Sequence, residues 1–496
     1  MHIFKNHLFL ISCVLLLFYS FSILYRSDSS FDQDLGRHLK TGEIIINSLS
    51  VPYINLFSYT NANFPFINHH FLFGVIIYLW SKFFDLQLFL HIKILIILTA
   101  VLLTFLNTKR TQSILLLPLG YLFLHVLRER TDLRPEIFSF LFTSVTVWVL
   151  ERFYSNKSSK LIFILPIIQF FWINIHIYFF VGFLLQGIYL IDLFLRKEVQ
   201  KFKALLFIFV GSLILCLINP NTINGLLYPL QIFSNYGYSI AENQNLFLLE
   251  RLGFTDPNFI FVKLCVLLII FTLIISILKK PYIIKNNLIS LQGIFLALVS
   301  IRGFPYIFYL SFPFIFLSLN NAEVNKKSLA LFICTTFLLI IESAFYLNGS
   351  YYKENKIPAE PKLILQENGK KALDFLLQND LPQPIYNNFD IGSYIIYRAY
   401  PKYKVFVDGR PEAYPADFFT NIYIPSQSDY SYFKELDNKY KFQTVVFSIT
   451  DQTPWGKSFL RSIIKDDSFA TVYLDNFIII LIKRDQLQAV KLAPIL

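Results

Sequence analysis

Ionisable side chains crowd the stretch that follows the first apolar segment of the chain. That segment runs from Leu8 to Tyr25, and the residues after it include two carboxylates, Asp32 and Asp34, together with Arg37 and His38. Ionisable groups are costly to place beside a membrane and usually serve a site there. We therefore interpret this stretch as part of a site. The alternative is a solvated loop in which an aspartate caps the start of a helix.

A second set of polar residues lies at the ends of later apolar segments. Its members are Arg128, Arg130, Asp132, Arg134, His176 and Arg302. A planar guanidinium group can bind two phosphate oxygens at once, so these residues, with His38, predict a binding site for a phosphate-bearing lipid. Two members have simple structural alternatives: Arg302 as an interface anchor, and His176 as a buried, hydrogen-bonded histidine.

The composition indicates what must position these groups. Of the 496 residues, 55% are hydrophobic, which excludes an ordinary soluble globule. The net charge of +11 does not indicate a nucleic-acid partner, because residues 347–496 hold 18 basic and 17 acidic side chains and the excess lies in residues 1–346. Such an excess is typical of a topology signal and of attraction to anionic lipids. The four cysteines lie in apolar runs, so we predict no disulfide framework, cofactor or metal motif.

Twelve apolar segments are candidates for membrane crossings. They lie near residues 8–25, 71–85, 86–106, 113–127, 135–153, 160–174, 175–195, 203–219, 258–278, 286–301, 304–319 and 328–346. The first is interpreted as a retained anchor, since no small-residue cleavage site follows it.

Clusters of lysine and arginine mark the cytoplasmic side of such a chain. Their positions put the N-terminus inside, and the first loop (residues 26–70) and residues 347–496 outside, which requires an odd number of crossings. The segment 71–85 is short and contains Lys82, so it is the expected exception. We predict 11 transmembrane helices within a domain of residues 1–346, with 13 as the next choice, and all the polar groups named above on the outer face.

The pattern changes after Tyr346. Short β-rich runs alternate with helical patterns, which predicts an extracytoplasmic soluble α/β domain over residues 347–496. One run, Val405–Val407, ends in Asp408-Gly409-Arg410. Ligands bind at the carboxyl ends of strands in open α/β sheets, so Asp408 and Arg410 could touch a substrate. A salt bridge within the turn is the preferred alternative.

Taken together, the chain resembles the GT-C superfamily of integral-membrane glycosyltransferases. The resemblance rests on the N-terminal helix, the acidic first outer loop, the second outer loop with arginine and aspartate, the many further helices and the C-terminal domain. Several short motifs also look like a largely uncharacterised bacterial branch of that group. They are Asp32–Glu43, Val51–Tyr53, Phe57–Thr60, Asn68–Leu72, Tyr386–Tyr394 and Val407–Arg410.

The resemblance implies a bacterial cytoplasmic-membrane enzyme that moves a sugar from a polyprenyl-phosphate donor to an extracytoplasmic glycan, lipid or protein acceptor by an inverting displacement. In such enzymes a first-loop aspartate is the general base, here Asp34 first and Asp32 second. A divalent metal on these two carboxylates is possible but not predicted. Two other classes stay open: a transporter or flippase of lipid-linked sugars, and a non-catalytic scaffold for envelope assembly. The lack of an internal repeat in the sequence favours the enzyme over the transporter.

The positive clusters make a topological prediction. A reporter fused after Leu496 should be active only outside the cytoplasm, because residues 347–496 follow an odd number of crossings from an inside start. Alkaline phosphatase activity of the fusion measures this, and a fusion to a reporter active only in the cytoplasm is the control. A cytoplasmic signal would remove the shared outer face on which the predicted site depends.

Overall fold

A computed structural model describes most of the chain in two compact units. The described residues are 2–28, 34–108, 113–128, 130–156, 160–232, 236–278, 284–318, 324–353, 361–364 and 366–495. We call the larger unit, Met1–Ser27 with Gln87–Leu226 and Ile240–Lys362, the helical unit. The smaller one, Asp28–Leu86 with Leu227–Ser239 and Leu363–Leu496, is the mixed unit. Each unit is built from three separate stretches of the sequence.

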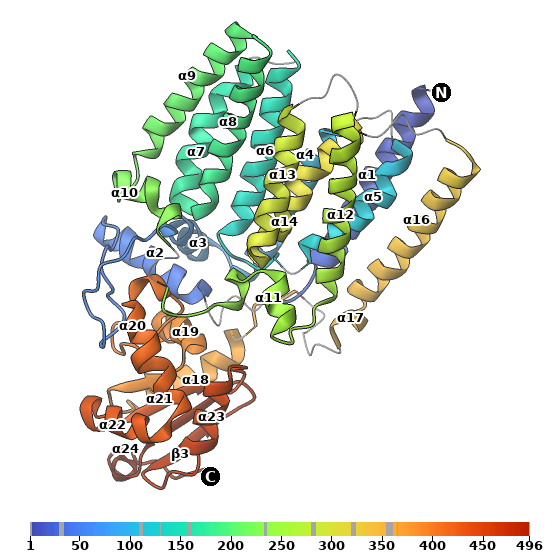
Figure 1. The fold of residues 1–496 in the computed structure, drawn as a ribbon. Coiled ribbons are helices and arrows are strands. Elements are labelled where there is room, and N and C mark those ends of the chain that lie inside the picture. The colour runs from blue at the N-terminus through green and yellow to red at the C-terminus, as the bar shows by residue number, and fades with distance from the viewer. Residues whose placement is uncertain are drawn as a thin grey trace. The chain divides into compact units, whose positions relative to one another are not determined.

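Apolar helices make up the helical unit (Figure 1). Within the described ranges, seven helical segments are long and apolar enough to cross a membrane. They contain α1 (His2–Leu24), α4 (Leu86–Leu106), α6 (Glu136–Tyr154), α8 (Phe180–Leu195, with the turn before it), α9 (Val199–Cys216), α12 (Pro257–Leu278) and α16 (Lys326–Leu347).

The remaining predicted segments are helical but shorter. They correspond to α3 (Phe71–Phe83), α5 (Ser113–Leu124), α7 (Ile164–Ile175), α13 (Ile284–Val299) and the continuous run of α14 (Phe304–Tyr306), a π-helical turn (Ile307–Ser311) and α15 (Phe312–Ser318). The expectation of a polytopic helical protein is thus confirmed. The number of 11 crossings stays a prediction, because length and composition do not decide whether these shorter helices cross a membrane.

Helices α6, α7, α8 and α9 pack against one another within the helical unit (Figure 1). The chain reverses between α7 and α8 at His176, whose backbone is extended (φ −154°, ψ 143°). Elsewhere in the same unit, α1 packs on α5 and α16. The breaks between helices therefore fall where the sequence places its polar residues.

A helix of the first loop packs closely on the helix that follows this loop in the mixed unit. They are α2 (Gly36–Ser48) and α3 (Phe71–Phe83), and each contributes a glycine to the contact. A Cβ atom added to Gly42 would lie 2.1 Å from the carbonyl oxygen of Gly74, and one added to Gly74 would lie 2.7 Å from the carbonyl oxygen of His38. The backbones of α2 and α3 can approach this closely only because neither position has a side chain.

The C-terminal part of the mixed unit contains a four-stranded sheet. Its strand order is β1 (Ile385–Asn387), β2 (Thr444–Ser448), β4 (Ile478–Lys483) and β3 (Phe469–Leu474). Strands β1 and β2 are parallel, and the other pairs are antiparallel. The helices that alternate with the strands are α18 (Gln366–Gln378), α19 (Phe389–Ala399), α22 (Tyr430–Tyr440) and α23 (Pro454–Ile463). The strands predicted at these four places are present.

The predicted strand at Val405–Val407 is wrong as part of this sheet. Val405 forms an isolated parallel bridge with Ser58 of the first loop instead. The amide of Val405 donates to the carbonyl of Phe57 at 2.9 Å, and the amide of Tyr59 donates back to Val405 at 3.3 Å. The backbone partner comes from a segment more than 340 residues away, which no local pattern indicates.

The grouping of residues differs from the division of the chain at residue 346. Residues 28–86 and 227–239 group with residues 363–495 in the mixed unit. Tyr238 shows how the second of these stretches is held, since its ring stacks on Phe389 at 4.6 Å. The predicted boundary between a membrane domain and a soluble domain stays a prediction, and the structure adds that the first outer loop packs with the C-terminal residues.

Replacing Gly42 by Ala should destabilise the mixed unit by about 1–3 kcal/mol, because the methyl group forces α2 and α3 apart. The effect is measured as the thermal unfolding temperature, with protease cleavage of the first loop as the signal of unfolding. Gly187→Ala in α8 is the matched control, since a Cβ atom there meets nothing within 4 Å. Equal unfolding temperatures for the two variants would show that the close helix contact does not matter.

Candidate functional site

The predicted site residues fall into two clusters, one in each unit. Asp34 and His38 lie in the mixed unit, whereas the arginines and His176 lie in the helical unit. Asp32 lies outside the described residues. The two clusters are therefore described separately.

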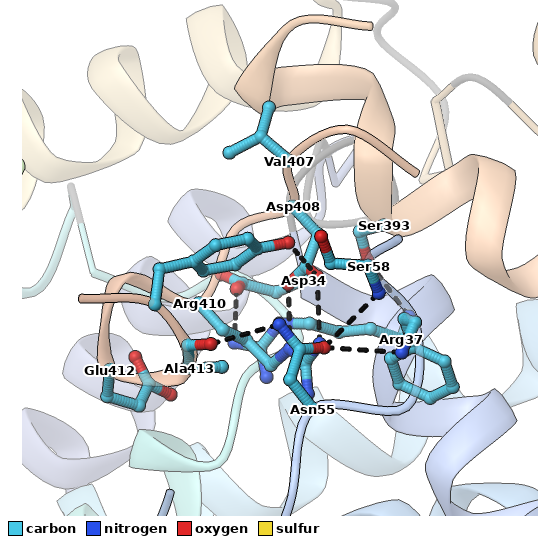
Figure 2. Close-up of polar contacts among 12 residues, drawn as sticks. Asp34, Arg37, Asn55, Ser58, Ser393, Val407, Asp408, Arg410, Glu412 and Ala413 are labelled. Atoms are coloured by element: carbon cyan, nitrogen blue, oxygen red, sulfur yellow. Dashed lines mark hydrogen bonds and ion pairs between the residues drawn. The ribbon is translucent and has the colours of Figure 1, made fainter. Parts of the chain in front are cut away.

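Asp34 sits in a π-helical turn immediately before α2 (Figure 2). Its Oδ1 accepts a hydrogen bond from an Nη of Arg37 at 2.7 Å. The amide of Arg37 donates instead to the hydroxyl of Ser393 at 2.9 Å, and the N-cap residue of α2, Leu35, forms no side-chain cap. The Asp34 side chain therefore does not cap the amide of Arg37, which is bound to Ser393 instead. The guanidinium group of Arg37 orients the Asp34 carboxylate.

His38, four residues after Asp34, is buried among aromatic rings. It makes edge-to-face contacts with Phe73 at 5.1 Å and with His70 at 5.6 Å between ring centroids. Burial, followed by the positive charge of Arg37, holds the pKa of His38 well below its usual value, although Asp34 acts in the opposite direction. His38 is therefore neutral at physiological pH and adds no positive charge to the cluster.

Asp408 and Arg410 form a buried ion pair (Figure 2). The Nε and one Nη of Arg410 donate to the two carboxylate oxygens of Asp408 at 2.7 and 2.8 Å. The same Nη donates to Oδ1 of Asn55 at 2.9 Å, and Tyr414 donates its hydroxyl to Asp408 at 2.8 Å. The side chains of Asp408 and Arg410 are only 0% and 5% exposed. The salt-bridge interpretation of this turn is confirmed, and every strong acceptor of Asp408 is occupied.

Asn55 connects this ion pair to the first loop. Its Oδ1 also accepts from the amides of Phe57 and Ser58, and its Nδ2 donates to the carbonyl of Ala413 at 2.9 Å (Figure 2). The Arg410 guanidinium lies over the ring of Phe57 at 4.8 Å, which adds a cation–π contact. Sequence reasoning missed Asn55, because nothing local links positions 355 residues apart.

Glu412 is a second carboxyl group that sequence reasoning missed. It follows the ion pair by two residues (Figure 2), and the hydroxyl of Tyr236 lies 3.5 Å from its Oε2. Burial raises the pKa of Glu412, and the charges of Arg37 and Arg410 offset this only in part. Glu412 thus retains its proton to a higher pH than an ordinary glutamate, which suits a hydrogen-bond donor better than a base.

Three arginines of the helical unit converge on one carboxylate, Glu242. An Nη of Arg134 lies 2.9 Å from both oxygens of Glu242, and Nη atoms of Arg130 and Arg302 lie at 2.7 and 3.2 Å. Arg130 also donates to Glu136, at the start of α6, at 2.8 Å. We call these five residues the arginine cluster. Arg130, Arg134 and Arg302 thus lie together around Glu242, which was not among the predicted site residues.

The electrostatics of the arginine cluster follow from its composition. Burial acts to raise the pKa of Glu242, but the three guanidinium groups outweigh it and hold this pKa well below the usual range. Glu242 is therefore ionised throughout the physiological range. With Glu136 as the second carboxylate, three positive charges face two negative ones, which leaves one positive charge in excess.

The other predicted residues of the helical unit form separate contacts. Asp132 pairs with Arg26 at 3.4 Å, and Arg128 lies 3.7 Å from Asp256 and over the ring of Tyr351. His176 shares a hydrogen bond of 2.7 Å with Ser139 and is buried. This hydrogen bond matches the structural alternative for His176, a buried and hydrogen-bonded histidine. Its role in substrate binding stays a prediction.

The described part of the chain contains no group of three or more His, Cys, Asp or Glu side chains that could hold a metal ion. Two carboxylates of the first loop were considered as ligands of a divalent metal. Asp32 lies outside the described part, and Asp34 accepts a hydrogen bond from the guanidinium of Arg37.

The comparisons with known proteins identify a fold rather than a family. No family model and no curated protein matches the chain. Among solved structures, the chain is similar to the oligosaccharyltransferase AglB of the archaeon Archaeoglobus fulgidus, solved with an inhibitory peptide and a dolichol-phosphate. The TM-score is 0.57 at 12% sequence identity, and the match covers 94% of this chain and 73% of the archaeal one. This similarity shows a fold like that of the archaeal enzyme, whereas membership of the GT-C superfamily and of its bacterial branch stays a prediction.

Replacing Arg410 by Ala should strongly destabilise the mixed unit, by about 3–5 kcal/mol, because it leaves the buried carboxylate of Asp408 without its partner. The measurement is the thermal unfolding midpoint of the purified protein. Lys402→Ala is the control, because its ion pair with Asp380 is exposed and such pairs contribute little. If the two variants unfold at the same temperature, the ion pair does not hold the first loop in place.

Proposed function

We propose that this protein is a membrane glycosyltransferase that moves a sugar from a polyprenyl-phosphate donor to an extracytoplasmic acceptor by an inverting displacement. The observation that carries the proposal is the placement of Asp34. Its carboxylate lies next to α2, is oriented by Arg37 at 2.7 Å, and belongs to a first loop packed in place by α3 and by the Asp408–Arg410 pair. The fold similarity to AglB supports the same class of enzyme.

Asp34 would act as the general base. An acceptor hydroxyl is a weak nucleophile, and a carboxylate within hydrogen-bond distance removes its proton as the new bond to the sugar forms. The guanidinium of Arg37 favours the ionised form of Asp34, which is the form that a base requires. His38 beside them is neutral, so Arg37 is the cation that pairs with Asp34.

The leaving phosphate would be stabilised by arginines of the helical unit. As the bond between the sugar and phosphate oxygen breaks, negative charge collects on the phosphate, and fixed donors aimed at that charge lower the barrier. The arginine cluster supplies guanidinium groups held by fixed partners and one uncompensated positive charge. Arg128 and Asp132 are proposed as further donor-binding residues at the edge of the same loop.

The partners of this proposed enzyme follow from its chemistry. The donor is a polyprenyl-phosphate-linked sugar, and the acceptor is a glycan, lipid or protein outside a bacterial cytoplasmic membrane. The neighbour AglB was solved with a dolichol-phosphate and a peptide, which are an isoprenoid phosphate and a protein-like ligand of that enzyme. A transporter of the same lipids would need the arginines but not an oriented carboxylate, so Asp34 favours the enzyme.

Replacing Asp34 by Asn should lower the rate of sugar transfer about 10²–10⁴-fold while donor binding is retained, because the amide keeps the shape of the side chain but cannot accept a proton. Transfer is measured in lipid vesicles with a radiolabelled lipid-linked sugar. Asp374→Asn serves as the control, because this carboxylate also pairs with a guanidinium, that of Arg398, in the same unit.

Three outcomes separate the possibilities. Loss of transfer by the Asp34 variant alone, with normal donor binding and thermal stability, supports the base. Near-normal transfer by that variant means that Asp34 is structural, and the assignment of the base is then wrong. A transporter or scaffold is indicated if the wild-type protein itself transfers no sugar.

A further inference from the structure

The two carboxylates of the arginine cluster, Glu136 and Glu242, differ in how the structure holds them. Glu136 begins α6 and is only 7% exposed, so the helix holds it in place. Glu242 lies on a short 3-10 turn, Ala241–Asn243, and its side chain is 27% exposed. One carboxylate is therefore built into the helical framework, and the other is presented by a loop to the same guanidinium group.

The geometry around Glu242 is that of an anion site. Two guanidinium groups from the connection before α6, those of Arg130 and Arg134, and one from the turn Ile301–Gly303, that of Arg302, reach its two oxygens within 3.2 Å. Arginine forks bind phosphate and carboxylate oxygens in the same way, so either anion suits these donors. A carboxylate has two oxygens to offer, whereas a phosphate group has more.

Donors outnumber acceptors at this place. Among the described residues, the Nε atoms of Arg130 and Arg302 and the amide nitrogen of Asn243 are buried without an acceptor, against one buried acceptor that pairs with no donor, the amide oxygen of Asn243, since Oε1 of Glu136 lies 2.7 Å from Arg130. Buried donors without partners are costly, so the arrangement with Glu242 leaves binding capacity unused. An anion with more oxygens than a carboxylate can use it.

From these observations we infer that Glu242 is an internal, exchangeable ligand of a phosphate site, and that the phosphate of the lipid donor binds Arg130, Arg134 and Arg302 by displacing it. The inference rests on the proposed function for the identity of the lipid. The exchange requires movement of the turn Ala241–Asn243, while Arg130 keeps its hydrogen bond to Glu136.

The charge balance favours the exchange most strongly for the product of transfer. With Glu242 displaced, three arginines face Glu136, a net charge of +2. The sugar-linked phosphodiester carries one negative charge, and the released monoester carries about 1.5–2 at neutral pH. The cluster therefore becomes neutral as the leaving group forms. Return of Glu242 to the arginines would then help to release the product.

The test uses the full-length protein in lipid nanodiscs, with inorganic phosphate and a short polyprenyl monophosphate as separate probes. Glu242→Gln removes the competing charge and keeps the side-chain shape, so both probes should bind roughly 5- to 150-fold more tightly, the range of a typical coupling between two ligands. Glu250→Gln is the matched control, because Glu250 lies on the same connection and pairs with Lys263 instead. The Glu250→Gln variant should bind both probes as tightly as the wild-type protein does.

Hydrogen exchange on the wild-type protein distinguishes displacement from simple repulsion. Displacement predicts that phosphate lowers the protection of residues 240–245, whereas a Glu242 that stays in place predicts equal or higher protection. The inference is overturned if protection does not fall, if Glu242→Gln binds no more tightly than Glu250→Gln, or if neither probe binds. If phosphate displaces Glu242 but the protein transfers no sugar, the proposed function is wrong and the inference about Glu242 stands. Binding of the lipid but not of inorganic phosphate would show that the prenyl chain is required.

Discussion

A buried charge must have a partner, and the Asp408–Arg410 ion pair meets this constraint in the mixed unit. Asp408 is completely buried, and Arg410 gives it two hydrogen bonds while Tyr414 gives a third. Because Arg410 also binds Asn55, the first loop is attached to the C-terminal residues by the same guanidinium group. The backbone bridge between Ser58 and Val405 and the contact of α2 with α19 join the same two parts of the sequence. Asp34, immediately before α2, belongs to the loop that these contacts attach.

The helical unit meets the same constraint in a different way. The Asp408–Arg410 pair is closed, since the side chain of Asp408 is inaccessible and its acceptors are taken. The arginine cluster retains an excess positive charge, donors without acceptors, and a carboxylate that is 27% exposed. Closed pairs of this kind hold a structure together, whereas open ones can bind a ligand. On this ground we interpret the first as structural and the second as part of the site.

The sequence predicted the elements of the fold well and their association less well. Every segment expected from its apolar length is helical, and the strands at β1 to β4 fall where β-branched residues gather, because these signals are local. The run at Val405 has the same local signal but pairs with the first loop, which depends on a distant backbone. For the site, Arg130, Arg134 and Arg302 were grouped in advance because each lies at the end of an apolar segment. Glu242, Asn55 and Glu412 gained their importance only from tertiary contacts, which local patterns do not report.

The claim that this protein transfers a sugar from a lipid carrier is tested most directly in the cells that make it. Mass spectrometry should compare the cell-envelope glycans and the lipid-linked sugars of cells with and without the gene. The account predicts that one glycan loses a single sugar on deletion, that the lipid-linked donor accumulates at the outer face, and that the wild-type gene reverses both changes. Unchanged glycans, or a donor that accumulates only at the inner face as expected for a missing flippase, would contradict it.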